Sequence, residues 1–497
     1  MEGGAPANEL LGELDLFVRP ATWPTLVLTR VVQQVATVDI STALSWIAHL
    51  ALGLRLVRTF ASEAQSREFL RPPSPVFAFA LTEASPGSDV NQIQTYAEPV
   101  PGGYRISGVK SWVTNAAWAS HFLVFARTVP LHAGNKPRLS AFVISPGSGV
   151  SVVPAHNEVL PGAGVGELRL DRVFVPEERR IGAAGKGFRM VMAGLAEARL
   201  LVGAAATGAC LRSFNDTVQR LNDRRAFGRP VGNFPSVQDR VSGMLGDVLA
   251  LESLVHGVAG PDTVEKQADP VERAIVRLAA SRISGRVLEG SRELFGAAAF
   301  VGNQAAARRW TDTRALTLLD GSDLALESYI VLEGTRKRRG QASLAAERDP
   351  LARLDALGTH ALTQVRARVR RAFSREVSGL SSNVFNAFVL EFTEKVAVEL
   401  EKHGDELIER QHVQRRLATV ASELCTWHAL ASRVQSEIAQ RGQLGSQRML
   451  EAAQVWIAGA TTRVRSQFDL LDQNDDLLRD RVAHRVYVDG IYPFDII

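Results

Sequence analysis

The spacing of apolar residues changes along this chain, and each change predicts a different kind of structure. Between residues 24 and 70, apolar side chains such as Val32, Val35 and Ala36 recur mostly at steps of three and four. That period places them on one face of a helix, so this region should be helical. The segment Arg71–Pro75 holds three prolines, which should end the helical region.

Between residues 76 and 175 the pattern shortens to an alternation of apolar and polar positions, as in Leu168–Val175. Alternation of this kind is typical of a strand with one buried face. Pairs of turn-forming residues separate the runs, at Gly102-Gly103, Pro146-Gly147 and Pro161-Gly162. Short runs divided by such turns predict a small antiparallel barrel or sandwich.

The pattern turns helical again after Gly187 and remains so to about Glu333. Residues 350 to about 480 form a further region with few glycines or prolines, which also predicts helices. The tail Arg485–Gly490 is expected to be a short extended end. Helices, then strands, then two helical regions predict an α+β protein that is mainly α.

Composition narrows the classes of function. The chain has 497 residues and a formal net charge of +4, which is too dilute to indicate nucleic acid as a partner. The two cysteines, Cys210 and Cys425, show no metal-ligand spacing, so we expect no metal site and a reducing compartment. There is no run of about 18 uncharged apolar residues, so a membrane-spanning helix is not expected. The N-terminus shows no basic or amphipathic leader, which favours the cytoplasm.

Two short segments carry the clearest chemical signal. The first contains Leu81 and Thr82, and the second contains Trp112 and Thr114. A threonine at the end of a strand can offer its hydroxyl and backbone N–H to a polar heterocycle. Trp112 lies two residues before Thr114, so both should point to one face of a strand and form a wall for a planar ligand. The alternative is that the threonines reflect only the preference of threonine for strands.

These segments resemble the flavin-binding signatures of the acyl-CoA dehydrogenase family. Ala80–Asp89 is similar to A-L-T-E-P-G-A-G-S-D, with Ala84-Ser85 in place of Pro-Gly, and Ser111–Asn115 is similar to W-I-T-N. The resemblance implies that Leu81, Thr82 and Thr114 hold the flavin of FAD, with the threonines bonded to its pyrimidine edge and N5. It implies that Trp112 flanks the isoalloxazine ring and that Ser88 lies near both cofactor and substrate. It also implies the acyl-CoA dehydrogenase fold.

Two further segments resemble the family's contacts to the FAD pyrophosphate of a neighbouring subunit. Arg224–Gly228 is similar to R-x-x-F-G, which implies roles for Arg224 and Phe227. Leu294–Ala297 is similar to I-F-G-G, which implies a role for Gly296. Glu293 stands where the family has glutamine, and a carboxylate beside a pyrophosphate is unfavourable. Glu293 should therefore turn away, or the adenosine half should lie differently. A site shared in this way implies a homodimer.

The catalytic base is the position at which this chain departs most from the family. Leu319–Ser322 matches the family's Y-E-G-T, so Asp320 takes the place of the glutamate, followed by Gly321 and Ser322. Aspartate is shorter by one methylene, roughly 1 Å, and an error of that size can cost on the order of 10²-fold in rate. The alternative is that Asp320-Gly321 is only a turn. Some relatives carry the base just before an arginine that matches Arg199, which is implied to contact substrate, but here Ala198 precedes it.

The region after residue 340 resembles the helical extension of very-long-chain acyl-CoA dehydrogenases. Tyr329–Gly334 is similar to F-V-A-L-Q-G, and Lys402-His403 matches a pair in that extension. Within it, residues 362–375 combine an apolar face with five arginines, which favours either packing on the protein or peripheral contact with a membrane. The expected domains are a shortened N-terminal helical domain (1–75), a β-barrel (76–180), a helical bundle (181–340) and the extension (341–497).

The implied reaction is FAD-dependent α,β-desaturation of an acyl thioester, with long-chain acyl-CoA as the expected substrate. Asp320 would remove the α-proton, and the β-hydrogen would leave as hydride to flavin N5. An electron-transfer flavoprotein is the expected acceptor. Two alternatives remain open: a flavin-binding partner subunit with little or no dehydrogenase activity, and a desaturase of a thioester bound to an acyl-carrier protein.

Overall fold

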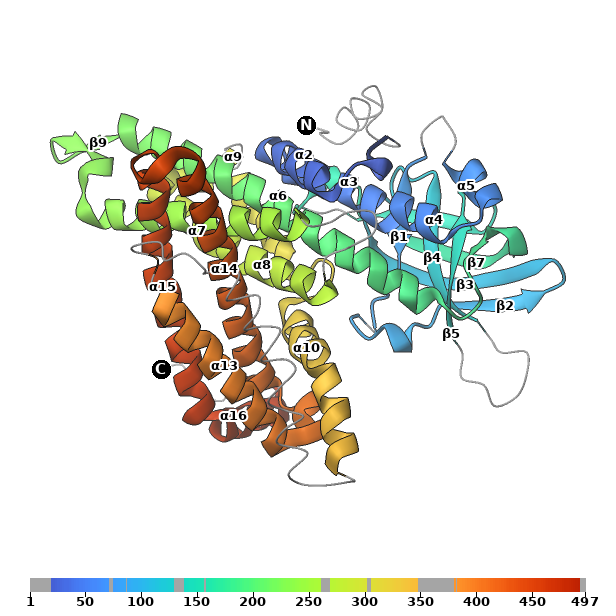
Figure 1. The fold of residues 1–497 in the computed structure, drawn as a ribbon. Coiled ribbons are helices and arrows are strands. Elements are labelled where there is room, and N and C mark those ends of the chain that lie inside the picture. Colours follow the sequence, from blue (N-terminus) through green and yellow to red (C-terminus); the bar gives the residue numbers. More distant parts are fainter. Residues whose placement is uncertain are drawn as a thin grey trace. The chain divides into compact units, whose positions relative to one another are not determined.

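The computed structural model describes residues 19–70, 75–85, 87–128, 138–155, 158–260, 269–301, 305–346, 380 and 382–491. Internal contacts divide the chain into two units, residues 1–326 and 327–497. Both are mainly helical, and the first also contains a sheet (Figure 1). The predicted class, α+β and mainly α, is therefore confirmed.

The first unit begins with the helices that the three- and four-residue period predicted. They are α2 (Thr25–Val38), α3 (Ile40–His49), η2 (Leu50–Leu54), α4 (Arg55–Phe60) and α5 (Glu63–Phe69). Asp39 caps α3 by accepting a hydrogen bond from the Thr42 amide at 2.7 Å. η2 is a π-helical turn that lies against the first strand, where a Cβ on Gly53 would stand 2.2 Å from the Cβ of Phe77. Only glycine permits that approach. Residues 71–74 of the expected proline stop lie outside the described residues.

Strands occupy the region in which apolar and polar positions alternate. They are β1 (Phe77–Ala80), β2 (Tyr96–Val100), β3 (Gly103–Val113), β4 (His121–Thr128), β5 (Arg138–Ile144), β6 (Val150–Pro154), β7 (Gly166–Pro176) and β8 (Arg180–Ile181). Their order is β6-β7-β3-β2-β4-β5-β8, with β1 beside β4. One face carries an apolar core that includes Phe122, Phe142 and Leu168.

The sheet is mixed, so the expectation of a purely antiparallel barrel or sandwich was wrong. β1 and β2 both run parallel to β4, whereas the other pairs are antiparallel. Parallel neighbours need a longer connection than a hairpin. Here the β2–β3 hairpin and the loops on either side of it separate β1 from β4 along the chain. Alternation within each strand does not encode that choice of partner.

A helical bundle completes the first unit. Its elements are α6 (Gly187–Asp223), β9 (Arg225–Ala226), β10 (Arg229–Pro230), α7 (Pro235–Ala259), α8 (Pro270–Phe295), α9 (Ala305–Arg314), η8 (Ala315–Thr317) and the start of α10 (Asp323–Ala346). α6 is one long helix that extends from the sheet to the β9–β10 hairpin (Figure 1). Small residues let its neighbours approach closely, since a Cβ on Gly208 would lie 2.2 Å from the carbonyl oxygen of Gln33 on α2.

Three helical stretches among the described residues are long and apolar enough, by length and composition alone, to cross a membrane. They are Ile40–Phe60, Gly187–Asp223 and Pro235–Ala259. The most apolar windows of the three are 89%, 78% and 50% buried inside the protein. The expectation that no such stretch exists was based only on runs without charged residues. These three helices are apolar enough on average although each includes charged residues. Packing within the first unit accounts for much of their apolar character.

The second unit contains the predicted helices of the extension. They are α13 (Ser382–His403), η9 (Gly404–Glu409), α14 (Gln411–Gly445), α15 (Gln447–Asp472) and α16 (Asp476–Asp489). Trp427, Phe388 and Phe468 form an aromatic centre among α13, α14 and α15. The basic segment 362–375, expected to be an amphipathic helix, lies outside the described residues.

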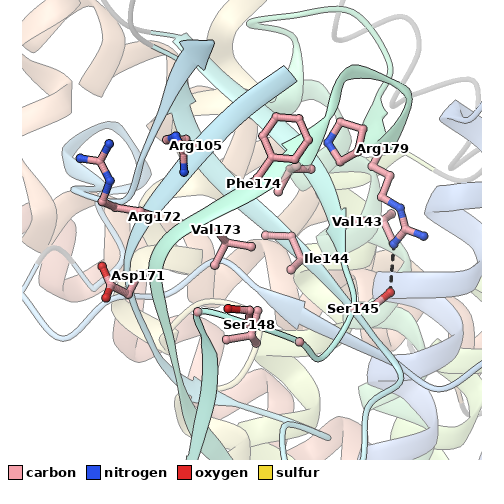
Figure 2. Close-up of a pocket in the computed structure, with 15 residues that line it drawn as sticks. Arg105, Val143, Ile144, Ser145, Ser148, Asp171, Arg172, Val173, Phe174 and Arg179 are labelled. Atoms are coloured by element: carbon pink, nitrogen blue, oxygen red, sulfur yellow. Dashed lines mark hydrogen bonds between the residues drawn. The ribbon is translucent and has the colours of Figure 1, made fainter. Parts of the chain in front are cut away.

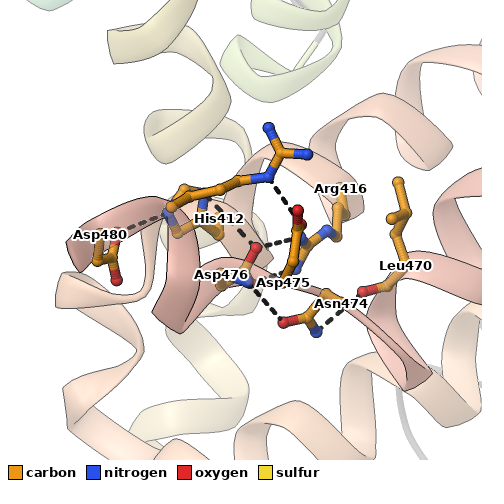
Figure 3. Close-up of polar contacts among 8 residues, drawn as sticks. His412, Arg416, Leu470, Asn474, Asp475, Asp476 and Asp480 are labelled. Carbon is orange, nitrogen blue, oxygen red and sulfur yellow. Dashed lines mark hydrogen bonds and ion pairs between the residues drawn. The ribbon is translucent and has the colours of Figure 1, made fainter. Parts of the chain in front are cut away.

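The tail was expected to be extended, and that expectation was wrong, because α16 continues to Asp489. Polar contacts attach the start of α16 to α14 (Figure 3). Arg416 is buried and donates to Asp476 at 2.7 Å, while His412 bonds to Asp480 at 3.1 Å. The alternation of Val486 and Val488 is typical of a strand. The ion pair between Arg416 and Asp476, ten residues earlier in the chain, anchors a helix instead.

Candidate functional site

The two segments with the strongest sequence signal lie side by side in the first unit. The Ser111 amide donates to the carbonyl oxygen of Thr82 at 2.9 Å, and Lys110 Nζ donates to that of Leu81 at 2.9 Å. Leu81 is buried and Thr82 half-buried. The chain after β1 is thus fixed against the end of β3. This brings Thr82 close in the fold to the segment that carries Trp112.

A buried ion pair that the sequence reading missed holds this junction. Glu83 accepts hydrogen bonds from Lys110 Nζ at 2.8 Å, the Thr95 hydroxyl at 2.6 Å, and the amides of Thr95 and Gln94 at 2.9 and 2.7 Å. Burial lowers the pKa of Lys110 to about 8, although Glu83 opposes the shift. Burial acts to raise the pKa of Glu83, but the bonds from Lys110, Thr95 and Gln94 together lower it. Glu83 and Lys110 therefore fix the segments that carry Thr82 and Trp112 to each other, and an alternating strand pattern gave no sign of their pairing.

Trp112 lies at a break in the regular strand. The register between β3 and β7 shifts between Lys110 and Val113, and Trp112 has a φ of +54°. Its side chain is 62% exposed. Thr114 is half-buried and follows the last residue of β3. The argument that strand alternation directs both side chains to one face was therefore wrong, because a bulge separates this region from the regular strand.

Asn115, another residue that the sequence reading did not single out, fixes the turn after Thr114. Its buried amide donates to the carbonyl oxygens of Ser45 and Phe77 at 3.0 and 3.1 Å and accepts from the Ser45 hydroxyl at 2.6 Å. Its φ of +67° is one that asparagine tolerates better than most residues. Asn115 thus ties the end of β3 to α3 and β1. Ser88 lies exposed in the loop that follows Thr82.

The second group of predicted residues lies where α6 and α8 end. Arg224 is exposed and follows the last residue of α6, and Gly296 caps α8 with a φ of +64°. A Cβ on Gly296 would lie 3.5 Å from Nη1 of Arg224, so the two positions are adjacent. Phe227 and Gly228 both have positive φ and form the two-residue turn between β9 and β10. Phe227 stands 94% exposed at its tip.

Glu293 has a cationic partner in this region. Arg240 on α7 donates to its carboxylate at 2.8 Å, and both side chains are substantially exposed. The negative charge that seemed unfavourable beside a pyrophosphate is therefore offset by a neighbouring guanidinium. Whether Glu293 turns away from a bound pyrophosphate, or the adenosine half lies differently, stays a prediction.

The third group surrounds Asp320. Asp320 and Gly321 both have positive φ, of +54° and +104°, so they form a left-handed turn between η8 and α10. Ser322 caps α10, because its hydroxyl accepts from the Ala325 amide at 3.3 Å. Burial raises the pKa of the half-buried Asp320 above its ordinary value, and the charges of Arg277 and Arg199 act against that shift. A carboxyl group with a raised pKa is suited to accept a proton near neutral pH.

Two buried arginines hold this turn. Arg199 on α6, predicted to contact substrate, donates from Nε to the carbonyl oxygen of Asp320 at 3.2 Å. Arg277 on α8 donates from Nε and Nη2 to the carbonyl oxygen of Leu319 at 3.0 and 2.8 Å. The sequence reading did not single out Arg277, since it is one of several arginines along this helix and belongs to no motif. The pairing with the base turn is visible only in the fold.

A shallow groove of about 540 Å³ lies elsewhere on the sheet (Figure 2). Asp171, Arg172 and Phe174 of β7 line it together with Arg105 of β3 and Arg179. Arg179 is already engaged, with Ser145 at 3.0 Å and Glu68 at 2.9 Å. None of the predicted site residues lines this groove, so it is not the site assembled above.

These groups can perform complementary chemistry. An exposed indole beside threonines suits a planar polar ring, and an exposed arginine beside a capping glycine suits a phosphate. The half-buried carboxyl group suits proton transfer. Among the described residues, no group of three or more His, Cys, Asp or Glu side chains could hold a metal ion.

Comparison with known proteins gives a consistent result over most of the chain. Residues 78–173 match the acyl-CoA dehydrogenase middle domain, residues 185–330 the acyl-CoA dehydrogenase C-terminal domain, and residues 379–487 the ACAD9/ACADV C-terminal domain. Human mitochondrial very long-chain specific acyl-CoA dehydrogenase is 26% identical over 455 residues, covering 88% of this chain and 69% of the relative. Mitochondrial isovaleryl-CoA dehydrogenase of Arabidopsis thaliana is 30% identical over 287 residues, covering 57% of this chain and 69% of the relative.

The fold has a solved counterpart as well. The crystal structure of acyl-CoA dehydrogenase from Bacillus anthracis, complexed with FAD, superposes with a TM-score of 0.81 at 20% identity. The match covers 98% of this chain and 86% of that one. The expected acyl-CoA dehydrogenase fold with a helical extension is therefore confirmed. The chain belongs to the acyl-CoA dehydrogenase family, with the C-terminal domain found in the ACAD9/ACADV branch.

Proposed function

We propose that this protein is an FAD-dependent dehydrogenase that introduces a double bond between the α and β carbons of an acyl thioester. The observation that carries the proposal is the turn at Asp320, where burial raises the pKa of the Asp320 carboxyl group, and Arg199 and Arg277 hold the backbone of the turn. Family membership supports acyl-CoA as the class of substrate. The other predicted residues supply the means to hold a cofactor.

The residues fit FAD at both of its ends. Trp112 presents an exposed aromatic surface beside Thr82 and Thr114, which suits the isoalloxazine ring and its polar edge. The exposed Arg224 lies beside Gly296 and suits the pyrophosphate, and Phe227 is exposed on the hairpin that follows α6. Because Phe227 is almost fully exposed at a hairpin tip, we infer that these residues serve a neighbouring subunit. When bound, FAD supplies the acceptor for the β-hydride.

The protein's own part in the reaction is proton removal and orientation. The Asp320 carboxylate takes the α-proton, the Cα–H bond breaks, and its electron pair forms the new carbon–carbon double bond as the β-hydride departs. The backbone N–H of Asp320 polarises the thioester carbonyl and so stabilises the negative charge that develops there. Ser88 and Arg199 contact the substrate. The side chain of Asp320 is one methylene shorter than that of glutamate. The position of the turn, which Arg199 and Arg277 fix, must make up this difference in reach.

We also propose the wider setting of the enzyme. The extension favours a long-chain acyl-CoA and a homodimer, with an electron-transfer flavoprotein as the electron acceptor. The expected domain division at residues 75, 180 and 340 remains a prediction, as does a cytoplasmic location with peripheral membrane contact.

A second candidate is a flavin-binding partner subunit with little or no dehydrogenase activity. The shortened base at Asp320 and the carboxylate at Glu293 favour it. The ion pair between Glu293 and Arg240 weakens that case, because it offsets the unfavourable charge. A desaturase acting on a carrier-protein thioester would use the same residues.

One titration separates these functions. The purified protein should show a flavin spectrum, and saturated acyl-CoAs of rising length, added without oxygen, should bleach it with one length class. Asp320→Ala should bind FAD but not bleach, whereas Asp320→Glu should retain bleaching. Bleaching by carrier-protein thioesters alone would move the substrate to that class. A yellow protein that bleaches with neither would contradict the dehydrogenase function and favour the partner subunit, and a colourless one would contradict the cofactor.

A further inference from the structure

The turn that carries Asp320 is held from two helices through its backbone. Arg277 on α8 donates two hydrogen bonds to the carbonyl oxygen of Leu319, the residue just before the base. Arg199 on α6 donates one to the carbonyl oxygen of Asp320 itself. Two successive carbonyl groups are thus fixed by guanidinium groups, and the side chain of Asp320 stays available for chemistry.

Arg277 also reaches the other side of the turn. Its Nη1 lies 3.4 Å from Oδ1 of Asp323, the first residue of α10, and Oδ2 of Asp323 accepts a hydrogen bond from the Ser281 hydroxyl at 2.7 Å. Ser281 lies one helical turn after Arg277 on α8. A single guanidinium therefore joins residues 319 and 323, on either side of Asp320. A lysine could not reproduce this, because an ammonium group lacks the planar fork.

The burial of Arg277 shows that this contact is costly to maintain. The side chain is fully buried, and burial lowers its pKa, with Asp323 and then Asp320 acting in the opposite direction. A buried ion pair adds little net stability compared with apolar residues of similar volume. The arrangement is therefore better explained by the geometry it imposes on the turn than by stability alone.

We propose that Arg277 is a positioning residue for the reaction, which fixes the turn that carries Asp320 and sets the positive charge beside its carboxylate. This inference rests on the proposed function, because it takes Asp320 as the base. The charged groups around the turn are Arg199 on α6, Arg277 on α8 and Asp323 on α10. Both arginines act to lower the pKa of Asp320. Removing the charge of Arg277 should therefore raise that pKa.

Two variants separate the geometric and electrostatic parts. Arg277→Lys keeps the charge but loses the fork, so the rate of flavin reduction should fall on the order of 10²-fold with little change in its pH profile. Arg277→Met/Asp323→Asn removes both charges without leaving a buried unpaired carboxylate. Its rate should also fall, and the acid limb of its profile should move to higher pH. Arg286→Lys is the matched control, because Arg286 lies on the same helix and pairs with Asp247 on α7.

Hydrogen exchange at residues 319–322 gives a readout that does not depend on catalysis. These amides should exchange faster in Arg277→Lys than in the wild type, and Arg286→Lys should leave them unchanged. The proposal would be overturned if both Arg277 variants showed the same rate, pH profile and hydrogen exchange as the wild type. If the wild-type flavin is never reduced, the proposed function fails, and unchanged exchange in Arg277→Lys would then overturn the positioning role separately.

Discussion

Positive backbone φ angles mark three residues that the sequence singled out, Trp112, Phe227 and Asp320, at +54°, +48° and +54°. A left-handed conformation costs a residue other than glycine about 1–3 kcal/mol, so it persists only where its surroundings enforce it. Each of the three belongs to a different part of the proposed site. Their residue types could be read from motifs, but their conformations depend on a bulge, a hairpin and a pair of arginines.

Trp112 should matter for the cofactor and little for stability. Because 62% of its surface is exposed, Trp112→Ala should change the free energy of unfolding by no more than about 1 kcal/mol. Loss of the aromatic wall should weaken FAD binding about tenfold. Equilibrium dialysis measures that affinity. Phe174→Ala, at a half-exposed aromatic on β7, is the control and should bind FAD as the wild type does. Equal affinities in both variants would remove Trp112 from the site.

The buried pair of Lys110 and Glu83 should behave in the opposite way. Lys110→Met leaves the Glu83 carboxylate buried without its cation, which should cost about 3–5 kcal/mol of unfolding free energy. Lys110→Met/Glu83→Gln should recover part of that loss, because no buried charge remains. Urea denaturation of both variants measures which of them has the higher unfolding free energy. A double variant less stable than the single would show that the pair does not act as a charge pair.

At the scale of elements, periodicity predicted which segments are helices and which are strands, and the structure agrees for most of the described chain. It could not predict that β1 and β2 run parallel to β4, since partner choice depends on long-range contacts. The tail was misread for a related reason. Val486 and Val488 favour a strand locally, whereas the ion pair from Arg416 to Asp476 anchors a helix. Glu83 and Asn115 lie within the quoted motifs, but their roles and that of Arg277 could not be predicted, because their partners are distant in sequence.

The attachment of α16 to α14 should depend on that ion pair. No residue of α16 is buried, and Leu477 and Tyr487 are 77% and 81% exposed, so apolar burial adds little. Arg416→Gln should therefore speed amide exchange in α16 while α15 stays protected. Arg463→Gln, which breaks the pair with Glu423 between α15 and α14, is the control and should leave α16 unchanged.

The same contact predicts a pH dependence. The hydrogen bond from Arg416 is the main cause that lowers the pKa of Asp476 below its ordinary value of 3.8. A lowered pKa means that the stabilisation is present above pH 3.8 and is lost as the pH falls through the folded value. The protection factors of the amides in wild-type α16, which correct for the change of intrinsic exchange with pH, should thus fall in acid, and should no longer do so in Arg416→Gln. A loss of protection in acid that survives in the variant would place the cause elsewhere.

At the scale of the whole molecule, the family and its fold could be recognised from a few motifs, because those motifs lie at the junctions that shape the site. The proposed sharing of a site between subunits rests on Arg224 and Phe227, which lie exposed in the segment that follows α6. Aromatic residues are enriched at protein interfaces, so the exposed ring of Phe227 at the hairpin tip is suited to contact with a second subunit.

A mixed dimer tests this sharing. The protein should elute at twice the mass of one chain. A dimer that combines one Arg224→Ala subunit with one Trp112→Ala subunit should hold one intact FAD site and one doubly damaged site. Half of the wild-type binding capacity should then remain at wild-type affinity. If Arg224 served its own subunit, both sites would be singly damaged and no site of wild-type affinity would remain.

The central claim is that Asp320 removes the α-proton. Its most direct test is the rate of anaerobic flavin reduction by a saturated acyl-CoA in the wild type and in Asp320→Asn, which keeps the shape of the side chain and its turn. General base catalysis contributes about 10²–10⁴-fold, so the variant should bind FAD normally and reduce it slower by that factor. The wild-type rate should also fall as the pH drops through the raised pKa of Asp320. A variant that reduces its flavin at the wild-type rate would contradict the account.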